Sequence, residues 1–223
     1  MSLLRTHGWR PPLLAGGVLM AMGGRMHPDA DAEDSLVQEL ATMTADDRWI
    51  PGHLLIVAGT VLMVGGLWAA RSATAWPRAH QALPWAAVAF SAYAVETVFH
   101  AAAAADHGQL EHGELGPIAL THVVLSSFLY PISGAALVFL ALTPIRTEIG
   151  LRRRVPVLAV VAGTSHALSV PTTLLLPDAE VTPMFAGAGV GMALWAIFTG
   201  LVGASRRRSV VREDEQLAEL RAS

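Results

Sequence analysis

Hydrophobic residues in this chain are gathered into long runs, and charged residues collect in the segments between them. Most of these runs reach about 20 residues, which is enough for a helix to cross a hydrocarbon layer roughly 30 Å thick. The pattern therefore predicts an all-α fold, a polytopic transmembrane helix bundle of about six spans. The expected spans are 11–26, 50–70, 83–105, 118–143, 155–176 and 184–204, within one transmembrane domain over residues 1–205 that is followed by a charged cytoplasmic tail over 206–223.

The composition favours burial in lipid over a soluble fold. The chain of 223 residues is 53% hydrophobic and only 15% charged, with a mean hydropathy of +0.47. A soluble domain of this length would interleave charged residues through every helix. The sequence contains no cysteine, which excludes disulfides and thiolate metal sites, and no lysine, which excludes Schiff-base chemistry.

Charges of opposite sign alternate between the segments that connect the expected spans. Acidic residues concentrate in 29–47, 106–114 and 178–180. The other segments are basic, and their arginines are Arg71, Arg78, Arg146, Arg152 to Arg154, Arg206 to Arg208 and Arg212. Because arginines are retained in short cytoplasmic loops, this alternation predicts a multi-pass protein of the plasma (inner) membrane with both termini cytoplasmic. The basic clusters flank the membrane, so they do not indicate a nucleic-acid partner.

The first apolar run, 11–26, has two interpretations. Its apolar part is short and lies between Arg10 and Arg25. It is either a short or tilted span, or a signal peptide in which Ala21 and Gly23 are small residues before a cleavage point. We expect the span, and both interpretations place the following segment outside.

The acidic segment 29–49 is too polar to span a membrane. Leu36, Val37, Leu40 and Met43 nevertheless recur in it at helical spacing. We therefore expect either an amphipathic helix lying across the outer mouth of the bundle or a solvated loop.

Three histidines are expected at one depth, just inside the outer surface. His53 and His122 lie one turn into their spans from the outer end, and His100 lies one turn before the outer end of its span. Glu96 precedes His100 by four residues, so both project from one helix face, and His166 lies deeper in its own span, near the depth of Glu96. Ionisable side chains are costly inside a bilayer, so these residues predict an outward-facing polar pocket.

The residue types of this pocket indicate a metal or haem cofactor. Neutral imidazoles and a carboxylate suit zinc, copper or iron, and paired histidines on facing helices also suit haem iron. We expect haem b or a transition metal, with His53 and His122 as the principal or axial ligands and with His100 and His166 as further candidate metal ligands. Glu96 is the candidate catalytic proton acceptor, with His166 as its buried partner. Such a centre would serve electron transfer or the oxidation of a lipid-soluble small molecule.

Two other functions are compatible with the same residues. Glu96 and His166 could be the proton relay of a proton-coupled small-solute carrier that holds no metal. Alternatively, the chain could be an accessory or structural membrane subunit. In that case the histidines near helix ends would be satisfied by water or by helix-end carbonyls.

Two smaller groups are weaker candidates for metal binding. The outer loop carries His107 and His112 beside Asp106 and Glu111, which could recruit a divalent cation, although a solvated loop is expected there. Thioethers can hold Cu(I), although methionines more often only pack. One thioether-rich group lies near the outer end of the first run and consists of Met20, Met22, Met26 and His27.

Overall fold

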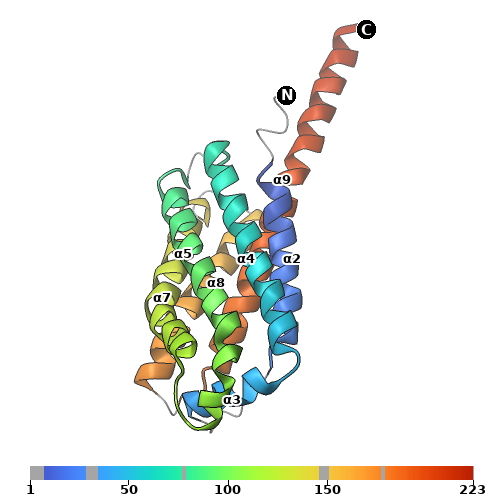
Figure 1. Ribbon diagram of the computed structural model, residues 1–223. Coiled ribbons are helices and arrows are strands. Elements are labelled where there is room, and N and C mark those ends of the chain that lie inside the picture. Colours follow the sequence, from blue (N-terminus) through green and yellow to red (C-terminus); the bar gives the residue numbers. More distant parts are fainter. Residues whose placement is uncertain (1–7, 29–34, 77–78, 146–150, 177–178, 223) are drawn as a thin grey trace.

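The computed structural model describes residues 8–28, 35–76, 79–145, 151–176 and 179–222, and it describes side chains there except at 143–153 and 203–222. Every regular element in these ranges is helical (Figure 1). The predicted all-α class is therefore confirmed. The six long helices are α2 (Arg10–Met26), α4 (Trp49–Ser72), α5 (Ala82–Ala102), α7 (Pro117–Ile145), α8 (Leu151–Leu175) and α9 (Thr182–Ala222). The three short ones are α3 (Leu36–Ala45), the 3₁₀-helix η2 (Ala103–Asp106) and α6 (His107–Glu111).

Five helical segments are long and apolar enough to cross a membrane. They are Trp49–Ser72, Ala82–Glu111, Pro117–Leu142, Arg154–Leu175 and Thr182–Val202. The second of them comprises α5, η2 and α6, which follow one another with no residue between them. These five candidate spans correspond to the last five runs expected from hydropathy, and α2 is considered separately below.

The six long helices form a closed ring in the order α2, α4, α5, α7, α8 and α9, in which α9 packs back against α2. The start of α2 and the end of α9 lie at one end of the bundle, whereas α3 lies at the other, which we call the α3 end (Figure 1). The ring order determines which side chains can meet, because residues on adjacent helices contact each other most readily.

Helix α2 packs against α4 at a distance that only glycine allows. A Cβ atom on Gly16 would lie 2.6 Å from the carbonyl oxygen of Gly59, and one on Gly59 would lie 2.7 Å from the carbonyl oxygen of Gly16. Small residues at regular spacing allow membrane helices to approach each other closely in this way. Helix α2 also buries Leu13 completely and contacts α9, so it is an integral part of the bundle.

The short helices close the α3 end. Ser35 and Gln38 form a capping box at the start of α3, and Leu40 packs with Trp49 and Leu110 in an apolar cluster. The amphipathic helix expected within 29–49 is therefore present over Leu36–Ala45, while 29–34 lie outside the described residues. This apolar cluster includes Trp49 from the first turn of α4 and Ala103 directly after α5.

Asp106 organises the start of α7. Its carboxylate accepts hydrogen bonds from the backbone N–H groups of Ile118 and Ala119, at 2.6 and 2.8 Å. These donors belong to the first turn of α7, where backbone N–H groups have no partner within the helix. Asp106 therefore caps α7, and among the described residues it is not part of a group of close potential metal ligands.

Candidate functional site

Four imidazole rings meet near the α3 end, one from each of four helices. His27 follows the last turn of α2, His53 lies on α4, His100 on α5 and His122 on α7. Ring centroids are 4.9 Å apart for His27 and His53, and 4.6 Å apart for His53 and His100. The rings of His100 and His122 are stacked, 4.1 Å apart with 17° between their planes. We call these four residues, together with Glu96, the histidine cluster.

Hydrogen bonds orient two of these rings. The Nδ1 atom of His53 lies 2.7 Å from the carbonyl oxygen of Trp49, so Nδ1–H donates and the lone pair of the ring is on Nε2. The Nδ1 atom of His122 lies 2.6 Å from Oε1 of Glu96, and donation to this carboxylate likewise leaves the lone pair on Nε2. In metal sites a carbonyl or a carboxylate commonly holds a ligating histidine in this manner.

Two buried polar atoms of the cluster have no hydrogen-bond partner. They are Nε2 of His53, whose residue is 1% exposed, and Oε2 of Glu96, whose residue is fully buried. A buried polar atom without a partner is unfavourable and calls for an explanation, such as a bound ion. Both atoms are donors that a metal cation accepts as ligands.

The donor atoms of the cluster group into two sets of three. Those of His27, His53 and His100 lie within 4.8 Å of one another, and so do those of Glu96, His100 and His122. The structure therefore brings four of the predicted residues together, and His100 belongs to both sets. The other three are His53, His122 and Glu96.

The sequence did not place Trp49 or His27 in the polar pocket, and His27 was considered only with the methionines of the first apolar run. The indole ring of Trp49 lies on the ring of His53 at 3.9 Å, and its Nε1–H donates to the carbonyl oxygen of Ala101 at 3.1 Å. The position of Trp49 one turn before His53 was the available signal. For His27, the signal was its place at the outer end of the first apolar run.

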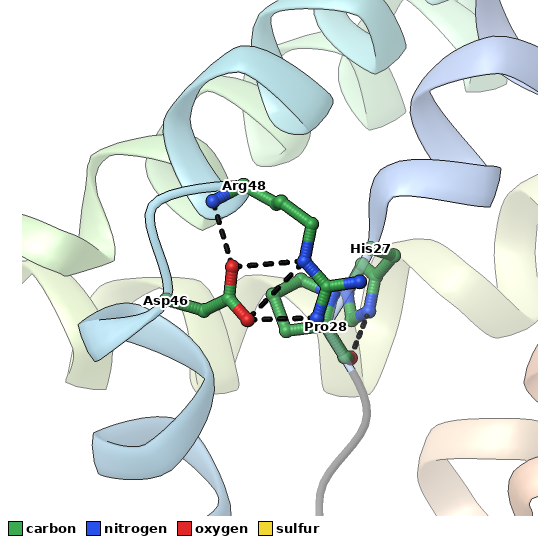
Figure 2. Close-up of polar contacts among 4 residues, drawn as sticks. All are labelled: His27, Pro28, Asp46 and Arg48. Atoms are coloured by element: carbon green, nitrogen blue, oxygen red, sulfur yellow. Dashed lines mark hydrogen bonds and ion pairs between the residues drawn. The ribbon is translucent and has the colours of Figure 1, made fainter.

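The connection between α3 and α4 contains an ion pair. Arg48 contacts the carboxylate of Asp46 through Nε and through its terminal nitrogen, the latter at 2.7 Å, and Figure 2 draws this pair together with His27 and Pro28. The side-chain hydrogen bond from Arg48 lowers the pKa of Asp46 from 3.8 to about 2. The pair is therefore formed by two full charges at neutral pH. The Nδ1 atom of His27 lies 2.8 Å from the carbonyl oxygen of Pro28 (Figure 2).

The expected contact between His166 and Glu96 is wrong. Nε2 of His166 lies 3.1 Å from Oγ of Ser133, and its ring stacks on Tyr130 at 4.2 Å and meets the ring of Tyr93 edge-on at 4.8 Å. Glu96 contacts His122 on α7 instead, while Tyr93, another residue of α5, reaches His166. His166 thus belongs to a second polar group, separate from the two donor sets.

His107 and His112 have separate partners and do not converge on one point. His107 contacts Thr44 through Nδ1 at 3.0 Å and Glu111 through Nε2 at 3.2 Å. His112 contacts the carbonyl oxygen of Gly108 in its own helical turn. The methionines of α2 also separate, since Met20 is buried in the core while Met22 is 52% exposed.

Comparisons of this chain with protein-family models, with curated proteins and with solved structures find no match.

Proposed function

We propose that this chain is a multi-pass membrane metalloprotein whose histidine cluster binds a transition metal. One observation carries the proposal: imidazoles from separate helices converge in a buried region, and Nε2 of His53 there has no hydrogen-bond partner among the described residues. Nitrogen donors with one carboxylate, and no thiolate in the chain, suit zinc, copper or iron. His53, His100 and His122 are the principal ligands.

The surrounding residues support ligand roles. The Trp49 carbonyl and the Glu96 carboxylate each fix one ring so that Nε2 presents its lone pair. Among the described residues, Oε2 of Glu96 has no hydrogen-bond partner, so the carboxylate can take either a cation or a proton there. We propose that the centre performs electron transfer or oxidises a lipid-soluble molecule, with Glu96 as the proton acceptor.

We propose a metal ion rather than haem. A porphyrin held axially by His53 and His122 must lie between their rings. The ring of His100 contacts both of them, at 4.6 and 4.1 Å, and Trp49 lies on the remaining side of His53. A macrocycle would have to displace these tightly packed aromatic rings, whereas an ion needs only small rotations.

We further propose six spans in the plasma membrane with both termini cytoplasmic, in which α2 is the sixth span. Its 17 residues reach about 26 Å, slightly less than a typical hydrocarbon layer. Arginine side chains at both of its ends can extend to the interface and make up this difference. Its packing between α4 and α9 supports a retained span over a cleaved signal. The α3 end then faces outward.

The test is purification in detergent followed by elemental analysis and an absorption spectrum, with loading by zinc, copper and iron salts. We expect bound metal without a Soret band, and less bound metal in His53→Ala and in His122→Ala than in the wild type. The matched control is His112→Ala, because His112 is exposed and contacts only its own turn. A Soret band would select haem. A folded protein that binds none of the three metals would contradict the proposal and favour the carrier or the accessory subunit.

Redox use has a separate test. If copper or iron is bound, potentiometric titration should show a reversible one-electron change per ion, which His53→Ala diminishes. Binding of zinc alone from a mixture of the three metals would overturn the redox assignment while leaving metal binding intact.

A further inference from the structure

The donors of the histidine cluster cannot all reach one ion as they stand. Ligand atoms of one ion lie at about 2.0–2.2 Å from it, so any two of them are at most about 4.4 Å apart. The five donor residues divide into the set of His27, His53 and His100 (the His27 set) and the set of Glu96, His100 and His122 (the Glu96 set). Each set has the compactness that one ion requires after a small rotation of the side chains, and the two sets share only His100.

Each set also contains one buried polar atom without a partner. In the His27 set this atom is Nε2 of His53, and in the Glu96 set it is Oε2 of Glu96. One ion in the His27 set would leave the Glu96 oxygen without a partner, and one ion in the Glu96 set would leave the His53 nitrogen without one. Since a buried polar group without a partner is unfavourable, occupation of only one set leaves one unfavourable atom in place.

We propose that the cluster binds two transition-metal ions, one in each set, with His100 bridging them as an imidazolate through one ring nitrogen to each ion. Because a neutral imidazole has only one lone pair, His100 releases its ring proton to water when the second ion binds. The inference rests on the proposed function and goes beyond it by fixing the number of ions and the ligands of each. The carboxylate belongs to the Glu96 set only, so that set has the greater negative charge and should bind a divalent cation more tightly.

Metal binding in the His27 set depends on the position of α2, because His27 directly follows this helix. Its Nδ1–H donates to the Pro28 carbonyl, which places the lone pair of the ring on Nε2 (Figure 2). An ion in this set joins α2 to α4 and α5. Loading of this set should therefore raise the thermal stability of the bundle, because a ligand that binds only the folded state stabilises it.

The experiment counts Cu(II) ions per chain in the purified full-length protein and records electron paramagnetic resonance spectra. We expect two ions in the wild type, with an integrated spin signal below two per chain because the neighbouring ions couple. His27→Ala and His122→Ala should each bind one ion and give an uncoupled signal of one spin per ion. His100→Ala should weaken both sites, whereas the control His112→Ala should keep two coupled ions.

Several outcomes separate this inference from the proposed function. One ion in the wild type that is lost equally in His27→Ala and His122→Ala would overturn the two-ion centre and retain metal binding. Two ions without coupling, one of which disappears in His112→Ala, would identify surface copper and also overturn it. No bound metal in the wild type would remove the proposed function itself. Because an alanine variant can fail to fold, His27→Gln and His122→Gln are measured in parallel and should give the same counts.

Discussion

Substitution of Glu96 by glutamine tests whether the carboxylate supports metal binding. Glu96 is fully buried, and its Oε1 accepts a hydrogen bond from His122 at 2.6 Å. Glutamine keeps the shape and one carbonyl acceptor but removes the charge that makes His122 a stronger ligand. Loss of such a supporting contact typically lowers metal affinity about 10- to 100-fold, which corresponds to about 1.4–2.7 kcal/mol. We expect a decrease in this range for the ion that His122 binds.

The assay is competition for the metal between the detergent-purified protein and a chromophoric chelator of known affinity. Ser126→Ala is the matched control, since Ser126 is buried one turn from His122 but donates only to the backbone oxygen of Val123, at 3.0 Å. The control should bind metal as the wild type does. An affinity of Glu96→Gln within twofold of the wild type would refute the reasoning, because it would mean that the carboxylate neither orients His122 nor attracts the cation.

Three further predictions concern packing, charge and topology. Gly59→Ala should destabilise the protein by about 1–3 kcal/mol in thermal unfolding, because its Cβ would lie 2.7 Å from a carbonyl oxygen of α2, whereas Gly65→Ala meets no atom within 4 Å and should not. Asp46 has a pKa lowered to about 2, so its ion pair stabilises the fold fully above pH 3.8 and is lost as the pH falls through about 2; a carboxyl titration by NMR with a midpoint near 3.8 would contradict this. In this cysteine-free chain, a cysteine at Glu111 should react with an impermeant maleimide on intact cells and one at Arg71 should not; the reverse result would invert the proposed orientation.

Hydropathy predicted the last five spans closely because the lipid layer determines their length. The run 50–70 became Trp49–Ser72, and the run 118–143 became Pro117–Leu142. Depth was predictable for the same reason, since a helix rises by a constant amount per residue. Counting from the outer ends placed His53, His100 and His122 at one level, and the structure brings their rings into contact.

Depth alone could not identify the partners of each side chain. Glu96 and His166 were expected at similar depths, but their helices are separated in the ring by α7, which supplies His122 to Glu96 and Ser133 to His166. The order of helices around the ring and the rotation of each one arise from packing across the whole bundle. Hydrophobic periodicity carries little of this information, because these helices are apolar on nearly every side.

The ligand set was also incomplete at the level of the sequence. His27 was noted only with the methionines of α2, because a residue beyond the end of a doubtful span had no assigned depth. Its proximity to His53 depends on the close glycine contacts between α2 and α4, which bring the ends of these two helices together. Those contacts became visible only with the backbone.

X-ray absorption at the edge of the bound metal tests the central claim most directly. We predict a first shell of nitrogen and oxygen at about 2.0–2.1 Å with the outer-shell scattering of at least three imidazoles, and no sulfur. A first shell that contains sulfur near 2.3 Å, or oxygen alone without imidazole scattering, would contradict a metal centre built from His53, His100 and His122.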